Sequence, residues 1–224
     1  MTLAFLSCLI LALFMLLAGR GSSEAQGAEV DHYLLALSWS PTFCASAEAE
    51  DESLQCGGNR HFAFVVHGLW PQDRRWHPPQ YCRTAENWVP QEQIEEMLPI
   101  MPSRSLIIHE WKKHGTCSGL GIEGYFDLTE SLFRKVRIPA RYLTPLQPVT
   151  VTPEALIADF VKTNRGLSPD MMYLLCKPRA GGARLQELRI CFSLDGQFAQ
   201  CRPRRRSDCA SETLVLPPVR GKID

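Results

Sequence analysis

Residues 185–201 read LQELRICFSLDGQFAQC, and this stretch decides the fold class because it predicts an antiparallel hairpin. Two apolar, strand-like runs flank the dipeptide DG at 195–196, which is typical of tight hairpin turns. With a three-residue loop beginning at Asp195, Cys191 and Cys201 face each other across the strands, as a cross-strand disulfide requires. The stretch therefore predicts a disulfide-closed hairpin in an antiparallel sheet.

Further strand-like runs occur at both ends of the chain. Residues 172–175 precede the hairpin, and YLLALSW at 33–39 and FAFVVH at 62–67 lie near the other end. We expect the strand at 62–67 to stop at Gly68, and a loop containing proline and tryptophan to follow it over 69–81.

Helical patterns occupy the middle of the chain. One begins near Gln91 and ends before Pro102, and a further helical segment covers 106–114. Helical spacing recurs at 125–136 and at 153–163. Strands at both ends with helices between them predict an α+β fold, in which helices pack against a mainly antiparallel central sheet stapled by disulfides.

Composition excludes some classes of protein. The 224 residues include 24 basic and 24 acidic side chains, and 45% are hydrophobic, which is ordinary for a globular protein and excludes disorder of the whole chain. The zero net charge gives no global basic field, so a site for a polyanion must be built from local charges. No repeat or Gly/Ser linker divides residues 26–224, which predicts a single domain.

The first residues have the pattern of a targeting segment. Residues 3–18 are apolar and uncharged, but they are shorter than the roughly 20 residues of a membrane span. The small-x-small sequence Ser23-Glu24-Ala25 predicts cleavage before Gln26, so that 1–25 form a signal peptide. An uncleaved anchor and a core helix are the alternatives. We expect a secreted or periplasmic protein that does not contact the membrane after cleavage.

Cysteine usage agrees with export. Of nine cysteines, only Cys8 lies in the expected signal peptide, and an even number of cysteines in an exported chain predicts disulfides. No clustered C-x-x-C pairs indicate a metal site. Besides the hairpin disulfide, we expect three more disulfides: one nested outside the hairpin, one that closes an acidic loop, and one that links segments distant in sequence. These are Cys176–Cys209, Cys44–Cys56 and Cys82–Cys117.

The densest polar cluster is HEWKKHGTC at 109–117. On a helix, with His109 at zero, Lys113 lies at about 40°, Glu110 at about 100° and His114 at about 140°. These four side chains share one arc, which can accept protons, donate them and neutralise an anion. Trp111 points elsewhere, and we expect it in the core.

A zinc site is the main alternative for this cluster. Zincins carry H-E-x-x-H, which places two histidines on one helical face. This chain has H-E-x-x-x-H, so the rings of His109 and His114 diverge by about 140°, and Lys113 adds an unfavourable positive charge. We therefore expect no metal and no cofactor. An exposed charged helix without function is the other alternative.

A second cluster, HGLWP, follows the strand at 62–67. His67 closes an apolar strand, Gly68 permits a sharp turn, and Trp70 offers a flat apolar surface. A lone histidine at a strand end is commonly structural, but a second histidine elsewhere supports an acid and base pair, His67 and His114. A reacting anion together with a stacking surface for a base describes RNA.

Both clusters lie in segments that resemble a known family. FVVHGLWPQ at 64–72 and IIHEWKKHGTC at 107–117 resemble the two active-site segments of the T2 family of acid ribonucleases. The resemblance covers most of residues 30–210, and MPSRSLIIHEWKKHGTCSGL at 101–120 is most similar to bacterial members.

The resemblance implies an α+β fold and metal-independent endonucleolytic cleavage of RNA, not DNA, through a 2′,3′-cyclic phosphate. It implies that His114 is the base and His67 the acid. Glu110 and Lys113 would stabilise the phosphorane. His109 would bind the phosphate and Trp70 would stack on a base. The cysteine pairing expected above is also similar to the disulfide pattern of the family, and we expect a monomer.

Other functions stay open at this point. Some family members carry an acidic residue after the tryptophan-proline pair where this chain has Gln72, which leaves base preference undetermined. A secreted binding protein with the same fold is one alternative, although inactive relatives typically lose a catalytic histidine. A zinc-dependent hydrolase and an additional role as a toxin or host-interaction factor are the others.

Overall fold

The computed structural model describes residues 29–46, 49, 52–57, 61–74, 78–179, 182–202, 207–209 and 211–219. Its centre is a six-stranded sheet in which β2, β1, β5, β6 and β3 follow in that order, and β4 also pairs with β5. The pairings are antiparallel, except that β5 and β6 are parallel. The strands are β1 His32–Trp39, β2 Phe64–Gln72, β3 Val149–Val151, β4 Met172–Arg179, β5 Gly182–Phe192 and β6 Leu214–Leu216.

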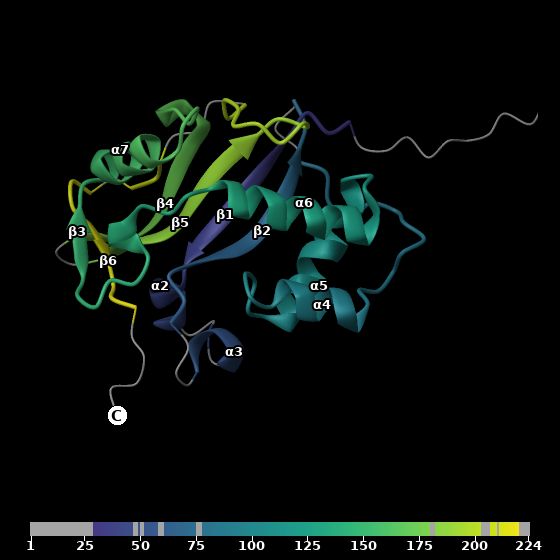
Figure 1. Ribbon diagram of the computed structural model, residues 1–224, viewed down its shortest axis with the longest axis horizontal. Coiled ribbons are helices and arrows are strands. Elements are labelled where there is room, and N and C mark those ends of the chain that lie inside the picture. Colours follow the sequence, from purple (N-terminus) through teal and green to yellow (C-terminus); the bar gives the residue numbers. More distant parts are fainter. Residues whose placement is uncertain are drawn as a thin grey trace, which may run out of the picture.

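Helices pack against this sheet, which confirms the predicted α+β fold class. In Figure 1, α6 crosses β1 and β2, α7 lies near β4, and α4 and α5 lie together beyond β2. The helices are α2 Ser40–Cys44, α3 Ser53–Cys56, α4 Gln91–Met97, α5 Arg104–Lys113, α6 Gly121–Lys135 and α7 Pro153–Thr163. Short 3-10 turns cover 115–117, 140–142 and 169–171.

The main core lies between the sheet and these helices. Leu35 and Leu37 of β1 are fully buried in it, together with Tyr125 and Phe126 of α6. Alternation along β1 turns Leu34 to the other face, where it joins a smaller apolar cluster with Tyr173, Cys191 and Cys201. The candidate site lies beside this smaller cluster.

Strand β2 extends further than the sequence indicated. It continues beyond Gly68 through Pro71 to Gln72, pairing with β1 throughout. Proline is tolerated here because β2 is an edge strand of the described sheet, where a residue without an N–H can face away from the neighbouring strand. The predicted stop at Gly68, and the loop expected from residue 69, are therefore wrong.

A bulge interrupts β2 at His67. Gly68 lies opposite Ala36 and Val66 lies opposite Leu37, which leaves His67 as the extra residue. A bulge of this kind bends a strand and re-aims its side chain. The residue that the sequence placed at a strand end is thus held inside a paired strand.

The hairpin after β5 turns one residue earlier than predicted. Ser193 and Gln197 close it through a backbone hydrogen bond, so the three-residue loop is 194–196. Gly196 has φ of +73°, and a three-residue hairpin loop requires its left-handed residue at the last loop position. The expected register and the expected strand at 197–201 are wrong, because a single bridge from Phe192 to Phe198 forms instead.

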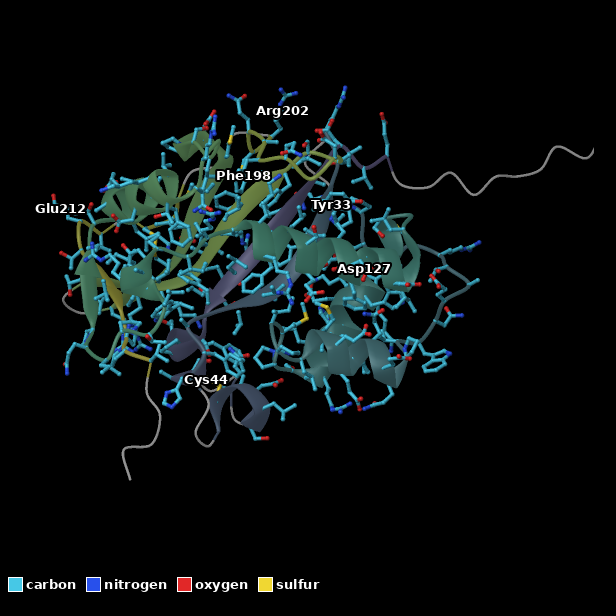
Figure 2. All side chains as sticks on the ribbon, viewed as in Figure 1. Tyr33, Cys44, Asp127, Phe198, Arg202 and Glu212 are labelled. Atoms are coloured by element: carbon cyan, nitrogen blue, oxygen red, sulfur yellow. A yellow bond between two sulfur atoms is a disulfide. The ribbon has the colours of Figure 1, made fainter. Side chains whose placement is uncertain are left out.

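Four disulfides join the pairs that the sequence analysis expected. They are Cys44–Cys56, Cys82–Cys117, Cys176–Cys209 and Cys191–Cys201. Cys44, labelled in Figure 2, is the last residue of α2, and its disulfide joins it to the last residue of α3. Cys82–Cys117 ties the loop before α4 to the turn after α5.

The expected signal peptide, 1–25, lies outside the described residues. No described helix is long and apolar enough to cross a membrane.

Candidate active site

Helix α5 presents the polar arc predicted from the sequence. Its N-cap Ser103 accepts a hydrogen bond from the backbone N–H of Leu106. The buried Trp111, which is 1% exposed, turns into the core and donates from Nε1 to the carbonyl of Glu86. This packing fixes the rotation of the helix and directs its polar face away from the core.

Residues of the arc differ in their burial. His109 is exposed and Lys113 is partly buried, whereas Glu110 is almost completely buried. His114 lies at the C-cap of α5 and its N–H bonds to the carbonyl of Glu110. The helix therefore presents an exposed imidazole and a partly buried ammonium group beside a carboxyl that is withdrawn from water.

The bulge in β2 brings His67 to this arc. Its Nε2 lies 3.9 Å from Oε1 of Glu110. The ring of Trp70 lies 5.3 Å from the ring of His67 and 5.4 Å from that of His114, measured between centroids. The two segments singled out in the sequence thus meet around one carboxyl group and one indole.

Gly68 allows Glu110 to approach the strand. A Cβ built on Gly68 would lie 1.9 Å from Oε2 of Glu110 and 2.6 Å from Nε1 of Trp70. The same two atoms form a hydrogen bond, in which Trp70 donates to Glu110 over 2.7 Å. Gly68 therefore provides space for this contact within a continuous strand, and not the sharp turn expected from the sequence.

Two residues of the site were missed in the sequence analysis. Glu187 of β5 places Oε1 2.6 Å from Nδ1 of His67, and Nε of Arg189 donates to Oε2 of Glu187 over 2.8 Å. The Arg189 guanidinium lies 4.6 Å from the ring centroid of Trp70. The alternation in LQELRICF could have shown that Glu187 and Arg189 share one face, but not that this face adjoins His67.

The two histidines beside Trp70 have pKa values shifted in opposite directions. Burial opposes protonation of His67, but the hydrogen bond and charge of Glu187 outweigh it and raise the pKa of His67. Burial, followed by the charges of Lys113 and His109, lowers the pKa of His114 to about 3. In mildly acidic solution, His67 therefore favours the charged form and His114 the neutral form.

The remaining groups of the arc are also shifted. Burial raises the pKa of Glu110 to about 7, although the charge of His67 and the hydrogen bond from Trp70 act against this. Burial and the charge of Lys113 lower the pKa of His109. Near neutral pH, Glu110 can thus carry a proton.

The two histidines are held differently. Glu187 fixes one ring nitrogen of His67, whereas Nδ1 of His114 is buried without a hydrogen-bond partner among the described residues. Packing against Trp70, with an interplanar angle of 33°, contributes to the orientation of the His114 ring.

Two cavities flank the cluster. One has a volume of about 500 Å³ and reaches His67 and His109, while the other has a volume of about 420 Å³ and reaches Lys113 and His114. The first is lined mainly by polar residues, including Ser38, Thr42, Gln55, Ser103 and Ser105. The second includes Trp70, Gln72, Tyr173 and Arg189. A chain-like ligand that crosses the cluster could enter both.

Elsewhere in the described part of the chain, three side chains lie close enough together to hold a metal ion. Cys176, Asp208 and Cys209 approach one another within 4.8 Å. Both cysteines are joined in a disulfide, so neither offers the thiolate that a metal would bind.

Comparison with known proteins identifies the family of the chain. Residues 30–201 match the ribonuclease T2 family. A ribonuclease from Aeromonas hydrophila is 33% identical over 226 residues, covering 95% of this chain and 99% of that protein.

Two solved structures share the fold. Trichomaglin, an S-like ribonuclease, has a TM-score of 0.66 and 20% identity, with 86% of this chain and 100% of that chain covered. RNase NT in complex with 5′-AMP has a TM-score of 0.65 and 23% identity, with 85% and 99% covered. The chain belongs to the ribonuclease T2 family, and it is an endoribonuclease that acts on RNA.

Proposed function

We propose that this enzyme cleaves single-stranded RNA by internal transphosphorylation. The 2′-oxygen attacks the adjacent phosphorus while the bond from phosphorus to the 5′ oxygen breaks. The products are a 2′,3′-cyclic phosphate and a free 5′-hydroxyl. In this reaction His114 takes the 2′ proton, and His67 gives a proton to the leaving oxygen.

The opposite pKa shifts of the two histidines carry this assignment. A base must be neutral and an acid must be protonated before the reaction begins, and these two imidazoles favour those states in the same pH range. Their common contact with Trp70 keeps both near one reacting group.

Glu110 and Lys113 stabilise the negative charge that develops on the phosphorane. The carboxyl of Glu110 carries a proton near neutral pH, so it can donate a hydrogen bond to a phosphoryl oxygen, as well as accept one. Lys113 lies in the last turn of α5 and supplies a positive charge. The exposed His109 binds the phosphate and Trp70 contacts a base in the cavity that it lines.

The mature enzyme is proposed to be a monomeric single domain, residues 26–224, released after removal of 1–25. Its four disulfides agree with an oxidising compartment, either the periplasm or the exterior of the cell. The acid and base roles fall to protein side chains, so the proposed reaction requires no metal.

Substrates without a free 2′-hydroxyl test this mechanism. We expect a mixed-sequence RNA to be cut, and the same sequence made as 2′-O-methyl RNA or as DNA to remain intact and to compete for binding. Cleavage of the methylated strand would exclude attack by the 2′-oxygen.

A further inference from the structure

The contact between His67 and Glu187 is the shortest ionic contact among the described residues of the site. Nδ1 of His67 and Oε1 of Glu187 are 2.6 Å apart, and the side chain of Glu187 is 6% exposed. The His67 side chain keeps 34% of its surface exposed, and its Nε2 lies toward Glu110. One ring nitrogen is thus held in the protein while the other remains available to a substrate.

The sheet explains how a residue of β5 reaches β2. On β1, which separates the two strands, Ala36 lies opposite Arg189 and Ser38 lies opposite Glu187. Both β1 side chains are short and share the face of the candidate site, so they leave room for a glutamate to reach across. The bulge re-aims His67 in β2, which explains how its ring can meet this carboxylate.

Arg189 holds the other oxygen of Glu187. Its Nε lies 2.8 Å from Oε2, and its guanidinium packs over the rings of Trp70 and Tyr173 at 4.6 Å and 5.8 Å. Both carboxylate oxygens are therefore engaged. A buried carboxylate fixed in this way favours a positive charge on the imidazole beside it.

We propose that Glu187 is a positioning residue for the acid of the reaction, and this inference rests on the proposed role of His67. Glu187 accepts the Nδ1–H of His67 and thereby directs the proton on Nε2 toward the leaving 5′ oxygen. As the bond from phosphorus to the 5′ oxygen breaks, the Nε2 proton passes to that oxygen. The Nδ1 proton stays in place, and Glu187 remains ionised throughout.

Titratable and charged groups from several elements face or approach His67, and besides Glu187 the charge of Glu110 raises its pKa while that of Arg189 lowers it. From β5 come Glu187 and Arg189, from α5 and its C-cap come His109, Glu110, Lys113 and His114, and Lys177 of β4 lines the same cavity. Of these, Glu187 makes the direct hydrogen bond to the ring.

A pair of substrates separates this role from a general loss of structure. A dinucleotide of RNA has a poor leaving group that needs protonation, whereas a nucleoside 3′-(4-nitrophenyl phosphate) releases a nitrophenolate without an acid. We expect Glu187→Gln to lower kcat on the dinucleotide by about tenfold or more and to leave the nitrophenyl ester within about twofold of wild type.

The pH profile supplies a second readout. The alkaline limb of kcat on the dinucleotide, where His67 loses its proton, should move to lower pH by about one unit in Glu187→Gln. Glu130→Gln is the matched control, because Glu130 pairs with Arg134 on the surface of α6 and should leave both substrates unaffected. An unmoved alkaline limb, or an equal loss on both substrates, would overturn the role of Glu187.

His67→Ala, measured on the same two substrates, keeps this inference distinct from the proposed function. Loss on both would show that His67 is not the acid, whatever Glu187 does. If Glu187→Gln does not fold, nitrogen NMR of the His67 ring in the wild-type protein tests the proposal instead. The proposal predicts a proton on Nδ1 and a pKa of His67 above its ordinary value, and a bare Nδ1 would overturn it.

Discussion

Replacing Gly68 with alanine tests how closely the site is packed. The new Cβ would lie 1.9 Å from Oε2 of Glu110, whereas ordinary contact begins near 3.4 Å, so the carboxylate must retreat by about 1.5 Å. Since Glu110 is 1% exposed, it has little free space to enter, and the hydrogen bond from Trp70 is lost with the movement. A shift of this size at a reacting group costs about a hundredfold in rate.

Steady-state cleavage of RNA measures the effect. We expect kcat/KM of Gly68→Ala to fall by about a hundredfold. The free energy of unfolding should fall by about 1–3 kcal/mol, because the new methyl group overpacks the strand. Gly124→Ala in α6 is the matched control, where the nearest atom is Cβ of the exposed Leu120 at 3.2 Å, and its activity should be unchanged. Wild-type activity in Gly68→Ala would refute a fixed role for Glu110.

Three further predictions follow from the protonation states and the helix caps. The pH–rate profile should be bell-shaped, with its maximum on the acidic side of neutral. The rate falls in acid because His114 gains a proton near pH 3, and it falls in alkali because His67 loses its proton. A flat profile from pH 4 to 9 would contradict this. Because the pKa of His114 is lowered in the folded protein, the folded state binds fewer protons than the unfolded state below about pH 6.5. The free energy of unfolding therefore decreases as pH falls from about 6.5 toward 3, by at most about 1.4 kcal/mol per pH unit. His114→Asn should abolish cleavage yet flatten that acid slope in urea titrations, and an unchanged slope would mean that His114 is not buried in its neutral form. Thr152→Ala removes the cap bond to the N–H of Ala155 and should cost about 1 kcal/mol of stability without changing kcat/KM, as thermal melts and RNA assays would show.

The sequence predicts the parts of the fold that depend on local pattern. The span of α7, the helical spacing within α5 and α6 and the strand over 33–39 are readable because spacing acts within one element. The family is also readable, because both motifs are continuous in the chain.

Features that depend on pairing between distant segments cannot be predicted from local sequence patterns. The continuation of β2 past Gly68 requires β1 as a partner, and the bulge at His67 is set by that register. The predicted loop at 195–197 would require Gln197 to adopt the left-handed conformation. In the structure the loop ends one residue earlier, at Gly196, which adopts this conformation readily. Glu187 could not be assigned from sequence, since its role depends on which strand lies two places away in the sheet.

Product analysis tests the central claim most directly. The purified mature protein would be incubated with a short mixed-sequence RNA in EDTA at mildly acidic pH, and the fragments identified by mass spectrometry. Internal transphosphorylation predicts fragments that end in a 2′,3′-cyclic phosphate, paired with fragments that begin with a 5′-hydroxyl. Cleavage that stops in EDTA and returns with zinc, or fragments with 5′-phosphates, would contradict it.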